Sequence, residues 1–156
     1  MAQDLAEYVL EELRATPAVT GLVVNSAGGI LESGDASAQT VANAQTTRRE
    51  TGNEAKILAV TVQDAGEKAL NAQRSEQRVA IWLFDRERGY ANIRLVTRAI
   101  YAALQGKSTS LTSPLSDRTV VIVIEMEART GHRHEPSLEM DFELMTFKAI
   151  VHLDLG

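Results

Sequence analysis

The residues best suited to chemistry in this sequence lie near its C-terminal end. His132 and His134 flank Arg133 and precede Glu135. Histidines two residues apart on a strand point to the same side and can share a metal ion. A third ligand would have to be His152 or a carboxylate, because the sequence contains only three histidines. We therefore interpret this segment as a surface turn that leads into the last strand, and we predict no metal site.

An acidic row follows in the same region. Glu139, Asp141 and Glu143 share one face of an extended strand, and apolar residues at the even positions share the other. Oxygen ligands in a row can bind Ca²⁺, but no Asp-Gly loop accompanies them, and carboxylates on one strand face repel each other. We interpret the row as a solvated outer face that can meet arginines of a neighbouring subunit.

Other motifs fall short of a nucleotide-binding or catalytic pattern. Gly106-Lys107-Ser108 is similar to the end of a phosphate-binding loop, but Tyr101 occupies the place of the required glycine and a helix precedes it. Serines are plentiful without a G-x-S-x-G turn. The chain has no cysteine, which excludes disulfides, cysteine nucleophiles and thiolate metal sites. We predict no catalytic residue and no cofactor, with acid–base catalysis by paired carboxylates left open.

Two mixed-charge clusters contain arginines. The fork of an arginine bonds both oxygens of a carboxylate, so arginines are favoured at subunit boundaries. We combine these clusters with the acidic row as candidate subunit or partner interface residues, namely Arg48, Arg49, Arg86, Arg88, Glu139, Asp141 and Glu143.

Length and charge narrow the possible classes. The 156 residues fit one domain, residues 1–156, and 44% are hydrophobic. No apolar run approaches the roughly 20 residues of a membrane helix, and the start lacks the pattern of a secretory signal. A net charge of -5 argues against a dedicated DNA-binding surface, which needs a basic stripe. We expect synthesis inside a cell and no membrane partner.

The middle of the chain predicts a central strand that feeds an amphipathic helix. Residues 79–84 are apolar at six consecutive positions, so we expect a strand covered on both faces inside a sheet. Ile93, Val96, Thr97, Ile100 and Leu104 then recur at helical spacing. The glycine at position 106 suits the positive φ of a helix C-terminus.

The remaining pattern completes an α+β fold. We expect a helix over residues 2–15, a short strand over 21–25, and longer strands over 57–62, 119–124 and 138–153. The polar segments 32–56, 63–77 and 105–118 are predicted as loops, the first of them either disordered or a binding element, the second with some helical content around 67–73. The expected architecture is a mostly antiparallel sheet of four to five strands packed against the N-terminal helix and the long amphipathic helix.

The last strand changes phase. Apolar residues occupy even positions up to Leu144 and odd positions from Met145 onward. A one-residue slip would turn the core face outward, and one extra residue would restore it. We therefore predict a β-bulge or bend at these two residues.

The chain resembles the tail terminator (tail completion) proteins of long-tailed bacteriophages and gene-transfer particles. The resemblance covers nearly the full chain and rests on three places: the opening helix and Pro-containing turn of residues 5–19, the strand and long helix of 79–104, and Thr130-Gly131-His132-Arg133-His134 before the final strand. The chain departs from the family where it has Glu54-Ala55-Lys56 in place of a Pro-Tyr-rich segment, and in its long polar segments 32–56 and 105–118.

This resemblance implies a non-enzymatic structural protein of the virion. Such proteins form a ring of six subunits that caps the head-proximal end of the tail tube, stops its elongation and offers a surface to a head-completion or connector protein. DNA passes through the ring without being read. The alternatives are a head-completion protein or a tail tube subunit of the same kind of particle, or an unrecognised small α+β enzyme or ligand-binding domain.

Overall fold

The chain forms a curled α+β half-barrel, seen in a computed structural model that describes residues 4–71, 74–112 and 119–153. The seven-stranded sheet has the order β1-β2-β3-β7-β5-β4, with β6 paired to β7 off this path. The strands are β1 (Ile30–Glu32), β2 (Ala59–Asn71), β3 (Arg74–Asp85), β4 (Ser108–Thr112), β5 (Thr119–Arg129), β6 (Arg133–Glu135) and β7 (Met140–Leu153). β1 and β2 pair in parallel, and the other ladders are antiparallel. The sequence predicted the class but too few strands.

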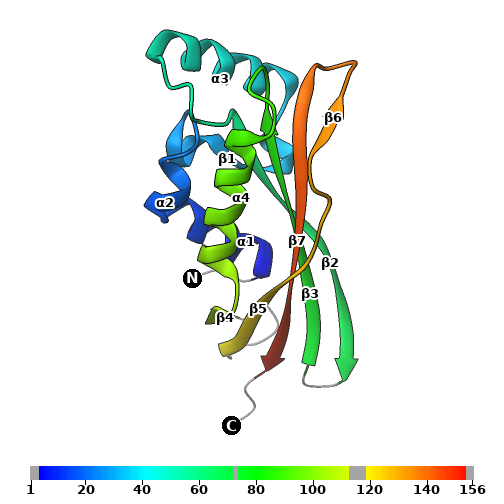
Figure 1. Ribbon diagram of the computed structural model, residues 1–156. Helices are drawn as coiled ribbons and strands as arrows, with labels where there is room; N and C mark the ends of the chain where they lie inside the picture. Colours follow the sequence, from blue (N-terminus) through cyan, green and yellow to red (C-terminus); the bar gives the residue numbers. More distant parts are fainter. Residues whose placement is uncertain (1–3, 72–73, 113–118, 154–156) are drawn as a thin grey trace.

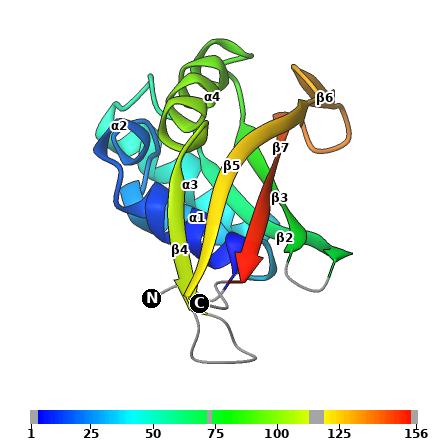
Figure 2. The same ribbon diagram turned by 90° about the horizontal axis from the view of Figure 1, so that it is seen from below.

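The helices gather on one side of the sheet. They are α1 (Leu5–Arg14), α2 (Pro17–Thr20), α3 (Ala38–Thr51) and α4 (Ala91–Leu104), with 3-10 turns η1 (Ser26–Gly29) and η2 (Ser33–Asp35). Figures 1 and 2 show the sheet curling around α1 and α4, while α3 lies across one end. The convex face of β3 and β7 lies away from α1 and α4, and α3 meets only its end, where Val41 and Ala44 pack with Met140. None of the helices among the described residues is long and apolar enough to cross a membrane.

The N-terminal helix forms where the sequence predicts it. The Asp4 side chain caps α1 by accepting a hydrogen bond from the Glu7 N–H. Leu5, Val9 and Leu13 are buried in the main core. The helix ends before Pro17, which opens α2 at the first helical position.

The central strand and the following helix are confirmed, with one correction. β3 lies between β2 and β7, and its odd-numbered residues Ile81 and Leu83 are fully buried against the helices. Trp82 and Phe84 point to the convex face and are only half-buried. The expectation of cover on both faces is therefore wrong for this chain. Gly106 takes φ 74°, the positive value predicted after α4.

The polar segment 32–56, for which at most a weak helical turn over residues 36–45 was expected, holds the full helix α3. Ser37 and Thr40 form a capping box at the start of α3, and Gly52 ends it at φ 70°. Val41 and Ala44 pack into a small second core with Leu58 and Met140. The apolar face is so narrow that helical periodicity is nearly absent, and the helix is defined by its caps and by burial of Arg48.

Two other polar segments are strands. β2 and β3 form one long hairpin through residues predicted as a connection with helical content, and Gly66, at φ 110°, lies in a register shift of β2. Part of the predicted linker 105–118 is β4, which pairs with β5. The short strand predicted over residues 21–25 is reduced to an isolated bridge between Val23 and Ile57.

The predicted β-bulge in β7 is wrong. The ladder between β3 and β7 runs without a break through Trp82↔Leu144 and Ile81↔Met145. The irregularity lies instead in the neighbouring strand, between Met126 and Ala128 of β5. Because β7 keeps one phase, its acidic residues at positions 141 and 143 share the concave face with the apolar core.

Candidate functional site

A buried polar cluster occupies the end of the sheet next to α3. Asp85 lies directly opposite Asp141 in the ladder of β3 and β7, and Glu143 lies opposite Leu83. Asp85 and Glu143 have no exposed surface, and Asp141 is 7% exposed. The interpretation of the acidic row as a solvated outer face is therefore wrong for Asp141 and Glu143. Glu139 is exposed, but it lies in the turn before β7, at φ 49°, and not on a strand face.

Glu143 is fully bonded within the chain. Arg129 Nε donates to its Oε1 over 2.6 Å. Its Oε2 accepts from Thr97 Oγ1 at 2.7 Å and from Tyr90 OH at 2.9 Å. Burial raises the pKa of Tyr90, and the adjacent Glu143 raises it further. These bonds hold β7 against α4 and the end of β5. Glu143 therefore has a structural role.

Asp85 joins the sheet to α3. It forms an ion pair with Arg48, whose guanidinium also donates to the carbonyl oxygens of Lys56 at 3.0 Å and Arg86 at 2.5 Å. Burial raises the pKa of Asp85; Arg48 opposes this shift, while Asp141 adds to it. The Arg48 side chain is only 2% exposed, so it makes its hydrogen bonds within the chain.

Asp141 holds the two histidines singled out in the sequence. Its Oδ1 lies 2.7 Å from His132 Nε2 and 3.1 Å from His134 Nδ1. The His132 ring stacks on Tyr90 at 5.1 Å between centroids. No three His, Asp or Glu residues in the described part of the chain are arranged to hold a metal ion. The two contacts fasten β6 and the turn before it to β7.

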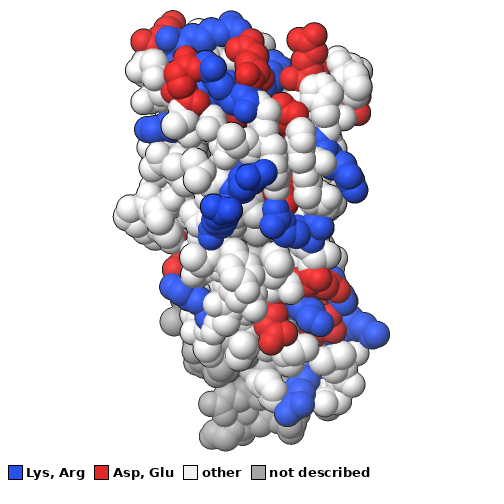
Figure 3. All heavy atoms as spheres, in the orientation of Figure 1, with Lys and Arg blue, Asp and Glu red and all other residues white. Residues whose placement is uncertain are grey.

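The remaining candidates lie at the surface of the same end. Arg49 pairs with Glu87 at 2.6 Å, Arg88 pairs with Glu54, and Arg86 donates to Gln45 at 3.3 Å. Figure 3 shows acidic and basic side chains interleaved over α3 and the adjacent end of the sheet. An open polar cavity of about 830 Å³ lies here, and four predicted interface residues line it: Arg49, Arg86, Glu139 and Asp141.

Sequence reasoning missed the partners of the buried acids. Tyr90, Thr97 and Arg129 carry no local motif, because their elements meet only in the folded sheet. The available signal was the phase change of the apolar pattern at Leu144. When the strand continues without a bulge through this residue, its acidic side chains face the core.

An aromatic groove on the convex face is the second feature that the sequence did not predict. The rings of Trp82 and Phe84 stack with centroids 6.4 Å apart, and Phe142 lies 5.9 Å from Trp82. The groove has a volume of about 390 Å³, and its further lining residues include Leu138, which is 52% exposed, and Met140. A half-exposed aromatic surface of this kind is typical of a protein interface.

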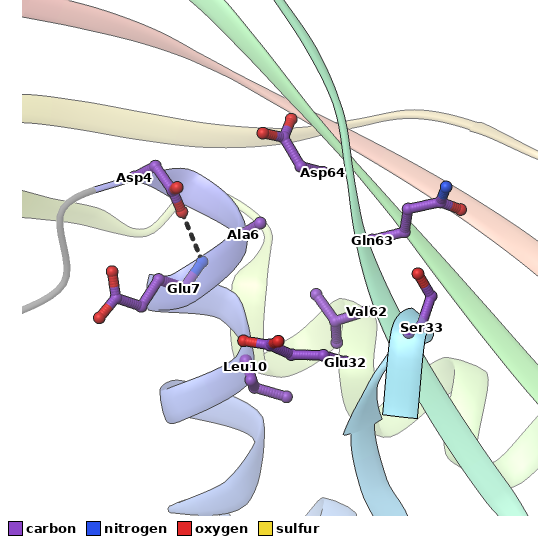
Figure 4. Close-up of a pocket in the computed structure, with 10 residues that line it drawn as sticks. Asp4, Ala6, Glu7, Leu10, Glu32, Ser33, Val62, Gln63 and Asp64 are labelled. Carbon is purple, nitrogen blue, oxygen red and sulfur yellow. Dashed lines mark hydrogen bonds between the residues drawn. The ribbon is translucent and has the colours of Figure 1, made fainter. Parts of the chain in front are cut away.

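A third pocket is acidic. Figure 4 shows Asp4 at the N-cap of α1, Glu7 within α1, Glu32 on β1 and Asp64 on β2 around an open pocket of about 350 Å³. Their carboxylates do not converge on one point, and Asp4 and Asp64 already accept backbone N–H bonds. This arrangement offers no built ligand site.

The sheet also presents unpaired borders. β1 pairs with β2 only as far as Val62, so residues 63–70 of β2 have a partner strand on one side only among the described strands. β4 is the opposite border, and within the part of the chain that the structure describes it pairs with β5 alone. Such edges are templates for pairing with another chain.

Comparisons with known proteins bear on the fold. No protein-family model matches this chain, and no curated protein matches it. It is similar to a chain in the virion of a native gene transfer agent particle, with a TM-score of 0.60 and 15% identity over 92% of this chain and 91% of the other. A protein from Akkermansia muciniphila, solved without its transmembrane region, matches with a TM-score of 0.35 and 13% identity over 97% of this chain and 83% of the other, which is too weak to support an argument. The chain therefore shares its fold, over nearly its whole length, with a component of a gene transfer agent virion.

Proposed function

We propose that this protein is a structural component of a phage-like virion, and specifically the tail terminator. In this role it forms a ring on the head-proximal end of the tail tube, stops tube elongation and joins the tail to the head. The observation that carries the proposal is the fold shared with a gene transfer agent virion chain over 92% of this sequence. The finer role, at the head-proximal end of the tail, rests on the sequence resemblance to tail terminators.

The surface of the chain supports a role in assembly. It combines two unpaired strand borders with an uncovered convex sheet face that exposes aromatic side chains. Head-to-tail contacts in a closed ring use two different patches per subunit, and unpaired strand borders are further sites at which another chain can pair. The buried acids are bonded within the chain, so they stabilise the subunit and leave recognition to the surface.

The proposed partners are further copies of the chain, the tail tube protein and a head-completion or connector protein. DNA passes through the ring without base recognition, in keeping with a net charge of -5. The location is the tail of the virion, at its head-proximal end.

Native mass spectrometry and electron microscopy test the proposal. We expect a hexameric mass, alone or in the presence of polymerised tail tubes, and tubes capped at one end. Particles that lack the protein should have overlong tails or tails not joined to heads. Absence of any tail would indicate a tube subunit instead. A chain that stays monomeric with tubes, and leaves them uncapped, would refute the ring.

A thermal-shift screen addresses the enzyme alternative. A large, reproducible stabilisation by a nucleotide or metal ion would favour a ligand-binding domain, because a ligand that binds only the folded state raises its stability. We expect no such shift.

A further inference from the structure

We propose that helix α4 of one copy packs into the aromatic groove of the next copy, and that this contact builds the ring. The inference rests on the proposed ring function and identifies the two surfaces that make it. Both surfaces are unpartnered in the single chain, and they lie on opposite sides of the sheet (Figures 1 and 2).

The first surface is the solvent side of α4. Leu95 and Tyr101 are 45% and 43% exposed, two of the few large hydrophobic residues that are exposed in the described part of the chain. Arg98 lies between them at a spacing of three residues, so all three share one side of the helix. The helix contains no acidic residue. The opposite side of the helix faces the core, where Ile93, Val96, Ile100 and other residues of α4 are buried.

The second surface is the aromatic groove on β3 and β7. Its floor is formed by Trp82, Phe84 and Phe142, and Leu138 forms an exposed wall. Glu135 is the one charged residue among those that line it. Its carboxylate is exposed and bonded to the neighbouring Ser137.

The two surfaces match in chemistry. The exposed side of the helix carries two apolar side chains and two arginines, of which Arg94 lies over the Tyr90 ring, 5.2 Å from its centroid. The groove offers an apolar floor and one glutamate, so an Arg98–Glu135 ion pair would fix the register of the apolar contact. A helix laid on the second face of the sheet also gives that face the cover that layered domains normally have. The polar cavity near Arg49 offers no comparable apolar area.

The geometry also determines the kind of assembly. The α4 surface and the groove are different patches on opposite sides of one sheet, so a subunit cannot satisfy one with the other. Contacts between unlike patches repeat from copy to copy and close into a ring when the rotation allows it. Each added subunit presents the same free groove to the next.

Cysteine cross-linking tests the contact directly, because the natural chain has no cysteine. We would mix the variants Leu95→Cys and Leu138→Cys under mild oxidation, with tail tubes present. A disulfide-linked dimer in the mixture, and none in either variant alone, supports the proposal. The matched control replaces Leu95→Cys by Leu70→Cys, which is 44% exposed at the end of the β2–β3 hairpin and should not cross-link to position 138.

Charge reversal gives an independent readout. Arg98→Glu and Glu135→Arg should each weaken subunit association about tenfold, in the range expected for loss and reversal of one interfacial charge pair. The double variant should recover most of that loss. Both positions are exposed, so circular dichroism should match that of the natural chain, although Glu135→Arg also removes the bonds of Glu135 to Ser137.

The outcomes separate this inference from the proposed function. A hexameric mass without the 95–138 disulfide, or with no effect of charge reversal, overturns the α4 contact and leaves the ring in place. A monomeric mass with uncapped tubes overturns both. Disulfides in the single variants would indicate two-fold pairing of like patches, which also contradicts the proposal.

Discussion

Asp85 and Asp141 lie directly opposite each other across two antiparallel strands, and both are buried. Two carboxylates in such a position repel each other unless each has a positive or donating partner. Arg48 supplies it for Asp85, and His132 and His134 supply it for Asp141. This arrangement ties three separate segments, α3, β6 and the β3–α4 turn, to one end of the sheet. This buried cluster therefore stabilises the fold.

The first prediction concerns the ion pair in this buried cluster. Arg48→Ala leaves Asp85 buried without its partner and should lower the free energy of unfolding by about 3–5 kcal/mol. Arg49→Ala, at the next position, removes only an exposed pair and should change it by less than about 1 kcal/mol. Urea unfolding followed by circular dichroism measures both. Equal effects of the two substitutions would contradict the structural role of Arg48.

The second prediction separates stability from function at the same pair. Arg48→Met combined with Asp85→Leu replaces the buried charges by apolar side chains of similar size, which is often neutral or stabilising. We expect the double variant to regain most of the stability lost in Arg48→Ala. It should also keep the oligomeric mass of the natural chain, because neither side chain reaches the surface. Loss of assembly in a stable double variant would show that the pair acts at an interface.

The third prediction is a pH dependence on the convex face. Arg78 lies 2.9 Å from Glu127 and lowers the pKa of that carboxyl, chiefly through their hydrogen bonds. The unfolded chain therefore binds this proton more readily, and the pair's contribution to stability is present above the ordinary pKa of glutamate. It is lost as the pH falls through the lower folded value. Glu127→Gln should therefore be less stable than the natural chain near neutral pH, and this difference should shrink in acid.

Thermal melts between neutral and strongly acidic pH check this dependence. Glu125→Gln, which removes another exposed carboxylate from the same strand, serves as the matched control. An acid limb that is unchanged by Glu127→Gln would contradict the proposed linkage.

Wherever one face of an element carries strong periodicity, the sequence predicted that element. Helix α1, strand β3 and helix α4 follow from Leu5, Ile81 and Ile93 and their repeats, because burial dictates these patterns. Helix α3 was not predicted because its buried residues are small or, like Arg48, charged. Its stability rests on its caps. The outer half of the β2–β3 hairpin was not predicted because its β2 residues are exposed on both faces, so they carry no apolar alternation.

The candidate site was half-predictable. Seven charged residues were singled out, and four of them line one cavity, but local spacing cannot tell a solvated acid from a buried one. The distinction depends on whether β7 bends at Leu144, and that is decided by its partner strands. β5 takes the irregularity instead, near Glu127. The aromatic groove could not be predicted from the sequence. Apolar residues on both faces of β3 indicate that both faces are covered, but they do not show whether the same chain or another chain covers them.

The fourth prediction concerns the start of α3. The Ser37 hydroxyl accepts the Thr40 N–H over 3.2 Å and completes the capping box. Ser37→Ala should cost about 0.5–2 kcal/mol of stability, because it leaves helix donors unsatisfied. Ser37→Asp should retain the cap and cost much less. Denaturant unfolding compares them, and equal losses would mean that tertiary packing alone holds the helix.

The fifth prediction contrasts two phenylalanines of β7. Phe147 has no exposed surface, and Phe147→Ala should lower the free energy of unfolding by about 3–5 kcal/mol. Phe142 lies on the half-exposed convex face, so Phe142→Thr, which keeps good strand propensity, should cost far less. Its effect should appear in assembly, because the substitution removes part of the floor of the groove. Native mass spectrometry of a folded Phe142→Thr chain should show fewer rings and more monomer than the natural chain. A variant with intact folding and an unchanged ring would mean that the convex face is not where copies meet.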